Sequence, residues 1–367
     1  MFHKALFGTS GKVAVSRITR NKPFYKPKQL NSSNSNFNRP DSYDICIKAK
    51  AIARSADAST ALSYALNQSN NLKSTSKPVL INTILTALSR EGQVEKFWDV
   101  VAAKVDGNKE LWSPQLAATL LNQIAREMET TSSSSEATET LMHKATQVYI
   151  EALETINFPE HLHVHNAYLK CISRYQNVPY LMWILNLIAK DQFKDIELDF
   201  NGIKDFLPVS DSSLRLAKLL MELKKPVALD CQSLTSILFT LSRSPDGSIQ
   251  LAESIWSKFQ NQIIDKPAYL SLLLVYRNDL SRIFTHRKLI RASSWRERKH
   301  ARVLEIIKSA GVDLSTDHKF LSVYFEICWN GKMKEKIGEY LEAKPVKTQD
   351  KRLLDIIKKA EVTRNGN

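Results

Sequence analysis

Cysteine is scarce in this chain, and its few cysteines are far apart. Cys46, Cys171, Cys231 and Cys328 include no C-x-x-C pair. Zinc-binding cysteines usually come in pairs about two to four residues apart, and a small disulfide-stabilised domain uses more of them. The cysteines therefore indicate neither a zinc site nor a disulfide framework, and we expect them to be small buried side chains.

Glycine and proline are also scarce, at ten and twelve of 367 residues. Because both are unfavourable in a helix interior, long stretches without them favour helices, and the sequence predicts an all-α protein. No apolar run reaches the roughly 20 residues that cross a bilayer, so no membrane span is predicted. The chain also lacks phosphate-binding, dinucleotide-binding, nucleophile-elbow and H-E-x-x-H motifs, which argues against an enzyme and against a cofactor.

Acidic residues are missing from residues 1–40, which contain eight Lys and Arg. The net charge of the whole chain is +14, so residues 41–367 carry +6. Basic residues interspersed with apolar and hydroxyl residues are typical of a mitochondrial transit peptide. We therefore predict that residues 1–40 are a transit peptide and linker, and that the protein acts in the mitochondrial matrix. A basic tail that itself binds nucleic acid is the alternative.

Three similar stretches are present in the rest of the chain. ILTALSR, YLKCISR and ILFTLSR begin at Ile84, Tyr168 and Ile237. Each lies in an apolar pattern of i, i+3, i+4 and i+7, and a turn and a second pattern of this kind follow it. The three stretches are therefore predicted to be first helices of helical hairpins.

The hairpins recur with a period near 35 residues. With Asn82 as the marker, the equivalent residues are Ala118, Asn166, Asn201, Thr235, Tyr269 and Leu321. Two intervals are longer, and we assign the excess to insertions near 130–140, which is loop-like and rich in serine, and near 278–298. Repeats of this length indicate an α-solenoid of helix-turn-helix units. The sequence predicts about seven degenerate units within residues 41–367.

A basic residue recurs eight positions after the marker. Two units have Val209 and Trp329 there, and the other five have arginine, namely Arg90, Arg126, Arg174, Arg243 and Arg277. One interpretation is a row of guanidinium groups that follows the phosphates of a nucleic acid. The other is that each arginine interacts with the carbonyl groups at the C-terminal end of its helix.

These features together resemble the pentatricopeptide repeat family in its degenerate fungal mitochondrial form. The resemblance rests on the period, the paired helices, the polar marker, the basic residue and the E-G-Q-V and N-G-K-M turns, and it covers roughly residues 76–345. The W-x-x-L-G-x-x-Y pattern of tetratricopeptide repeats is absent. The family implies a concave basic groove that binds single-stranded RNA, one base per repeat.

The same resemblance assigns base-contacting residues. In the family, the polar marker residue and a residue at the end of the same repeat read one base together. The first role falls to Asn82, Asn166, Asn201 and Thr235, and the second to Asp230 and Asp265. Asp230 with Asn201 would favour uracil, and Asp265 with Thr235, after a one-residue slip, guanine. The alternative for each polar residue is a helix cap or turn.

Residues 277–302 form a second candidate surface. They include nine Lys and Arg but only two acidic residues, and aromatic residues lie among them. This mixture suits phosphate contact and base stacking, and a solvated amphipathic helix is the alternative. The candidate residues are Arg287, Lys288, Arg291, Trp295, Arg296, Arg298 and Lys299.

The three histidines of HLHVH, which begins at His161, do not predict a metal site. They alternate along the chain, but no carboxylate or thiol completes a recognisable set of ligands.

We therefore predict a mitochondrial protein without enzymatic activity that binds single-stranded RNA and acts in the stability, processing or translation of organellar transcripts. The first alternative is a structural or assembly component of the small subunit of the mitochondrial ribosome. There the basic insertion and the lysine-rich tail from Lys332 to Lys359 would contact ribosomal RNA. The second alternative is a helical scaffold that binds proteins. The oligomeric state does not follow from the sequence.

Overall fold

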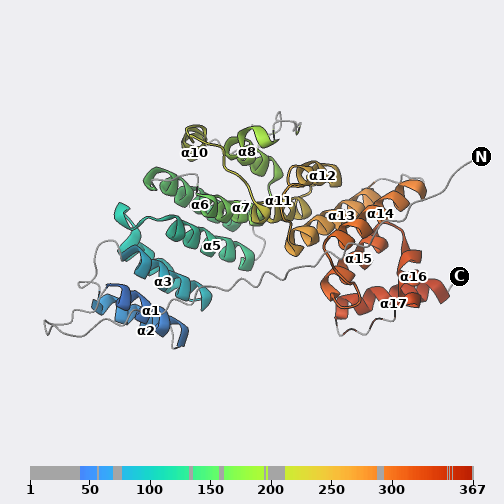
Figure 1. Ribbon diagram of the computed structural model, residues 1–367, viewed down its shortest axis with the longest axis horizontal. Coiled ribbons are helices and arrows are strands. Elements are labelled where there is room, and N and C mark those ends of the chain that lie inside the picture. Colours follow the sequence, from blue (N-terminus) through green and yellow to red (C-terminus); the bar gives the residue numbers. More distant parts are fainter. Residues whose placement is uncertain are drawn as a thin grey trace, which may run out of the picture. The chain divides into compact units, whose positions relative to one another are not determined.

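The computed structural model describes residues 42–55, 58–68, 77–131, 135–156, 161–193, 196, 211–286, 293–344, 346, 348 and 350–365 (Figure 1). The predicted transit peptide lies outside them. Residues 41–367 form one compact unit. Its described residues contain helices and no β-strand, which confirms the all-α prediction.

The helices follow the predicted hairpins closely. In chain order they are α1 (Ser42–Ser55), α2 (Ala58–Gln68), α3 (Lys77–Arg90), α4 (Val94–Val100), α5 (Pro114–Thr130), α6 (Ser135–Thr155), α7 (Leu162–Tyr175), α8 (Val178–Ile188), α10 (Asp211–Met221), α11 (Cys231–Arg243), α12 (Ile249–Ser257), α13 (Lys266–His286), α14 (Ser293–Ser309), α15 (His318–Asn330), α16 (Lys334–Ala343) and α17 (Lys351–Asn365). Short helical turns occupy Val101–Val105, Lys109–Leu111 and Lys190–Phe193.

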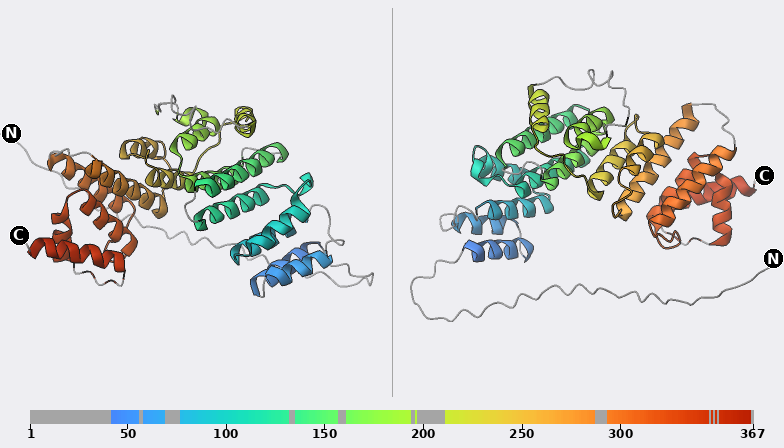
Figure 2. Two further views of the ribbon diagram at one scale, coloured as in Figure 1. Left: turned by 180° about the vertical axis from the view of Figure 1, so that it is seen from behind. Right: turned by 45° about the horizontal axis from the view of Figure 1, so that its top comes forward.

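Seven helices pack side by side and we call them the first-helix row, namely α1, α3, α5, α7, α11, α13 and α15 (Figures 1 and 2). In this row α1 contacts α3, α3 contacts α5, α5 contacts α7, α7 contacts α11, α11 contacts α13, and α13 contacts α15. Each of α2, α6, α8, α12 and α14 packs against the row helix before it and the row helix after it. The pair α1 and α2 precedes the first unit that the sequence predicts.

The fourth predicted unit departs from this arrangement. Its marker, Asn201, lies outside the described residues, and its second helix, α10, packs against α6 and α8. Among the described helices, α7 and α11 are in direct contact. The first helix that the sequence predicts for this unit lies outside the described residues, so that part of the repeat assignment stays a prediction. The row passes directly from the third unit to the fifth.

The two predicted insertions are largely helical. The first insertion, near residues 130–140, was predicted to be loop-like. Its second half lies in α6, which begins at Ser135, so the loop prediction is wrong for residues 135–140. Of 278–298, the part up to His286 extends α13 and the part from Ser293 begins α14. Burial explains the helix at 135–140, because α6 buries Met142 and Tyr149 on one face, and this outweighs the weak helix propensity of its serines and threonines.

The turns after three first helices share a left-handed backbone. Gly92 follows α3 at φ 72°, Gln176 follows α7 at φ 61°, and Lys332 follows α15 at φ 57°. The chain then reverses and closes the helix end. Met333 N donates to Cys328 O (2.8 Å) after α15, as in a Schellman turn. These turns are the predicted E-G-Q-V and N-G-K-M segments and their equivalent after α7.

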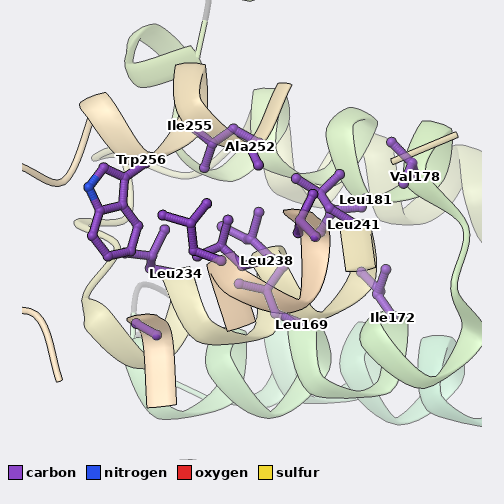
Figure 3. Packing of buried hydrophobic residues seen from close by; sticks show 14 of the residues in the cluster. Leu169, Ile172, Val178, Leu181, Leu234, Leu238, Leu241, Ala252, Ile255 and Trp256 are labelled. Atoms are coloured by element: carbon purple, nitrogen blue, oxygen red, sulfur yellow. The ribbon is translucent and has the colours of Figure 1, made fainter. Parts of the chain in front are cut away.

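The core lies between the first-helix row and the second helices. Figure 3 shows it where α7, α8, α11 and α12 meet. All of its labelled residues are less than 9% exposed, namely Leu169, Ile172, Val178, Leu181, Leu234, Leu238, Leu241, Ala252, Ile255 and Trp256. Fully burying one such leucine stabilises the fold by about 1.5–3 kcal/mol, so this core fixes α7 against α11.

Candidate nucleic-acid interface

The five predicted arginines lie on consecutive helices of the first-helix row. Arg90 is on α3, Arg126 on α5, Arg174 on α7, Arg243 on α11 and Arg277 on α13. Val209, which interrupts the series in sequence, lies outside the described residues, and the contact of α7 with α11 closes the gap. The arginines therefore form one uninterrupted series, which we call the arginine row.

Arg126 contacts the end of the preceding row helix. Its Nη1 donates to Ser89 O (2.9 Å) and Ser89 Oγ (2.8 Å) at the C-terminus of α3. Two asparagines further along the row also donate to backbone carbonyls of the preceding row helix. Asn278 on α13 donates to Ser242 O of α11, and Asn330 on α15 donates to Arg277 O (3.1 Å). Arg126 therefore binds a C-terminal carbonyl of the preceding helix, whereas the second interpretation placed each arginine at the end of its own helix.

Arg174 and Arg243 share one aromatic ring. The guanidinium carbons lie 4.8 Å and 4.3 Å from the ring centroid of Phe239 on α11. Arg174 also pairs with the carboxylate of Glu129 on α5 at 3.1 Å. The Arg174 side chain is 14% exposed, whereas Arg243 is an exposed residue. Cation–π contacts therefore hold both guanidinium groups beside one ring, although like charges repel.

Positive charge accumulates around this ring. The pKa of Arg243 is lowered by burial and by the charges of Arg174 and Arg277, although Glu129 opposes the shift. The pKa of Lys170, one turn before Arg174, is lowered by burial and by Arg174 and Arg126. Each of these groups would hold its proton more strongly if an anion lay nearby. The row is therefore a site where a bound phosphate would relieve repulsion.

Arg277 forms an ion pair with the next row helix. Its Nη1 lies 2.8 Å from Oε2 of Glu326 on α15, and the two side chains are 24% and 16% exposed. Its Nε donates to Asn278 Oδ1 (2.9 Å). Arg277 therefore connects α13 to α15, and it is less available to a ligand than Arg243.

The predicted base-contacting residues instead join neighbouring helices or cap them. Asn82 accepts a hydrogen bond from Thr119 Oγ1 (2.7 Å), and Thr235 Oγ1 donates to Cys231 O (2.9 Å) within α11. Asp265 accepts from Ala268 N (3.1 Å) at the start of α13. Asp265 therefore has the helix-cap role that the sequence left open, whereas Asn82 joins α3 to α5 and Thr235 bonds within its own helix.

Asn166 and Asp230 contact each other. Asn166 is 3% exposed, and its Nδ2 donates to Asp230 Oδ1 (3.1 Å). Asp230 is also the N-cap of α11, where it accepts from Ser233 N (2.9 Å). The predicted partner of Asp230, Asn201, lies outside the described residues. In this conformation Asn166 has no edge free for a base.

The basic insertion is only partly described. Arg287, Lys288 and Arg291 lie outside the described residues. Arg296 donates to Lys332 O (3.1 Å), and the exposed Arg298 donates to Ser294 O (3.3 Å) within α14. Arg302 is held by Glu253 (2.9 Å) on α12. The described half therefore contacts protein, and Trp295 and Lys299 face a cleft discussed below.

Three residues on the same face were not predicted. Asn122, Lys170 and Phe239 each lie four positions before an arginine of the row, so each lies one helical turn earlier. Lys170 Nζ donates to Asn122 Oδ1 (3.1 Å), which joins this second line of side chains across α5 and α7. The three residues differ in type, so no recurrence in the sequence marks them.

Comparison with models of known protein families finds no match to the chain, and a search of curated proteins finds none similar to it. The pentatricopeptide resemblance therefore stays a prediction. Within the described part of the chain, no helix is long and apolar enough to cross a membrane, and no three His, Cys, Asp or Glu side chains are grouped as metal ligands. His161 and His163 lie with ring centroids 5.4 Å apart.

Proposed function

We propose that this protein is a mitochondrial α-solenoid of the pentatricopeptide type that binds single-stranded RNA and has no enzymatic activity. The observation that carries the proposal is the uninterrupted arginine row, with Arg174 and Arg243 crowded on Phe239. The first-helix row would supply the inner face of the solenoid. Sequestration of an organellar transcript would then affect its stability, processing or translation.

The chemistry of the row suits a single strand. Guanidinium groups bind phosphate through paired N–H donors, so successive helices provide successive backbone contacts. Phe239 provides an aromatic face, and base–aromatic stacking contributes about 1–3 kcal/mol per base. Duplex RNA lacks splayed bases for this ring. The match of charge and ring therefore favours a single strand.

Two alternative functions, a component of the mitochondrial ribosome and a protein-binding scaffold, would give different results in the experiments below. Ribosomal RNA would be the ligand of a component of the mitochondrial ribosome. A protein-binding scaffold would use apolar surface, and α10 exposes Leu214 and Met221 by 64% and 68%. The arginine row favours RNA over this second function, because those two side chains lie on a helix outside the row.

The first experiment reverses charge in the row. The double variant Arg174→Glu/Arg243→Glu should bind an unstructured RNA oligonucleotide at least tenfold more weakly than the wild type. The slope of log affinity against log salt should also become shallower by about 1.4, because each lost phosphate contact removes about 0.7 on single strands. The matched control is Lys224→Glu/Lys308→Glu, which makes the same change in net charge at exposed lysines outside the row. Equal affinity and slope in both variants would refute the proposal.

The second experiment identifies the RNA. Crosslinking the protein to RNA in mitochondria and sequencing the recovered RNA should give one or a few transcript sites. Recovery of ribosomal RNA alone would instead assign the protein to the ribosome. Recovery of no RNA would exclude both and leave the scaffold.

A further inference from the structure

A cleft lies between α12, α13 and α14, and none of the five arginines of the arginine row lines it. Its volume is about 800 Å³, within the roughly 300–1,000 Å³ range of sites for small molecules. Its walls are the loop 245–248, the first turns of α12, the second half of α13 and the start of α14. We call it the α12–α14 cleft.

The loop wall of the cleft is held rigidly. The guanidinium group of Arg282 donates to Ser244 O (2.8 Å), Pro245 O and Gly247 O (2.6 Å). Gly247 packs so closely on α11 that a Cβ there would lie 1.8 Å from Leu241 O. The cleft is therefore preformed, and a ligand would not have to order this wall.

Asp279 presents an unused acceptor in the cleft. Its Oδ2 accepts a hydrogen bond from Ile249 N (2.9 Å) at the start of α12. Its Oδ1 has no hydrogen-bond partner among the described residues, although the side chain belongs to a half-buried residue. A half-buried acceptor of this kind favours a ligand that brings an N–H donor. The exposed Asp246 adds a second carboxylate at the rim.

An aromatic ring and a cation lie on the opposite wall. Trp295 and Lys299 are one turn apart on α14, and Lys299 Nζ lies 5.9 Å from the ring centroid of Trp295. The ring gives a stacking face for a planar group. Lys299 favours an anionic group beside that ring, and the carboxylates of Asp246, Glu253 and Asp279 lie elsewhere in the lining.

We propose that the α12–α14 cleft binds a ribonucleotide whose base carries an exocyclic amine. The base stacks on Trp295 and donates its amine to Asp279 Oδ1, and the phosphate lies near Lys299. Adenine, cytosine and guanine carry such an amine, whereas uracil has a carbonyl oxygen at the position of the cytosine amine and only its ring N3–H as a donor on that edge. The ligand is either a free nucleotide or one nucleotide of an RNA strand. This inference does not depend on the arginine row, because a mononucleotide needs no contact there.

The test uses the full chain and calorimetric titration with AMP, CMP and UMP. AMP and CMP should bind at least fivefold more tightly than UMP. Asp279→Asn keeps an oxygen for Ile249 N but places an amide donor in the cleft, so this variant should reverse the preference towards UMP. Helix capping alone would not produce such a reversal. Trp295→Leu should weaken all three nucleotides, and the exposed control Lys308→Gln should weaken none.

A second experiment distinguishes a free nucleotide from a nucleotide of an RNA strand as the ligand. If only the RNA strand is bound, the mononucleotides give no heat, but photocrosslinking to an RNA oligonucleotide maps to Trp295 and is lost in Trp295→Leu. The variant Arg174→Glu/Arg243→Glu should retain mononucleotide binding, so failure of the arginine row and failure of the cleft give different results. Binding of AMP, CMP and UMP with equal affinity, or no mononucleotide binding and no crosslink at Trp295, overturns the proposal.

Discussion

Asn166 on α7 donates a hydrogen bond to Asp230, the residue that caps α11, across 3.1 Å. Ser233 Oγ completes the arrangement by donating to Asn166 Oδ1 (2.5 Å). By their place in the repeats, Asn166 and Asp230 were both predicted to read a base. In the structure they join α7 to α11. These are the first helices of the third and fifth predicted units, so one predicted unit lies between them in the sequence.

Asn166→Ala should lower the free energy of unfolding by about 1–3 kcal/mol, because it removes the buried hydrogen bonds that Asn166 makes with Asp230 and Ser233. Urea denaturation measures this loss. Gln232→Ala is the control, since Gln232 is exposed and its contact with Asn166 is long, at 3.5 Å. A variant of Asn166 that keeps its stability but changes the preferred base would show that base reading is its role after all.

Phe239→Leu should weaken RNA binding by about tenfold. The substitution removes both the stacking face and the ring that holds Arg174 and Arg243 in place. Phe239→Tyr keeps the ring and should bind RNA like the wild type, and filter binding compares the two variants at one salt concentration. If leucine and tyrosine bind equally well, the ring does not contact RNA.

Glu253→Gln should lower the free energy of unfolding by about 1–2 kcal/mol. Glu253 on α12 accepts from Tyr276 of α13 (2.6 Å) and from Arg302 of α14 (3.0 and 2.9 Å), so one carboxylate connects three helices. Its side chain is 28% exposed, and water screens part of the interaction. Thermal denaturation should give a much smaller change for Glu339→Gln, which loses only the exposed pair with Lys336. Equal losses would mean that the network adds nothing beyond a surface pair.

Acid should destabilise the protein partly through His300. Burial, together with the charge of Lys336, lowers the pKa of His300 in the folded state below its usual value near 6.5. The unfolded state therefore binds a proton first, and the contribution of His300 to stability is present above about pH 6.5 and lost as the pH falls through the folded-state pKa.

The measurement is urea denaturation of the wild type and His300→Gln between pH 5 and 8. As the pH falls, the free energy of unfolding of the wild type should decrease more than that of His300→Gln. A difference that stays constant with pH would show that His300 titrates alike in both states.

The local structure of this chain follows from its sequence to a large extent. Periodic apolar residues place the helices, and the Ser-Arg pairs mark the ends of α3 and α11 to within one residue. Arg126 lies one turn before the end of α5, because the helix continues to Thr130. The helix at 135–140 was missed because burial further along α6 outweighs the turn propensity of the serines.

The candidate site followed from the sequence less completely. The arginines were found because they recur at one position, but Phe239 does not recur and only its distance from Arg243 links it to the row. The contact of α7 with α11 was missed for a different reason. A one-dimensional period gives the order of units along the chain, and it does not tell which units pack against each other in space.

The contact of α7 with α11 also indicates where this chain can accept insertions or deletions. The hydrogen bond from Asn166 to Asp230 closes a loop of 64 residues, whereas the bond from Thr119 to Asn82, on the preceding row helices, closes one of 37. Doubling a loop adds only about 0.6 kcal/mol of closure entropy, so the longer connection costs less than that. The residues between α8 and α11 are therefore a place where insertions or deletions leave the spacing of the arginine row unchanged.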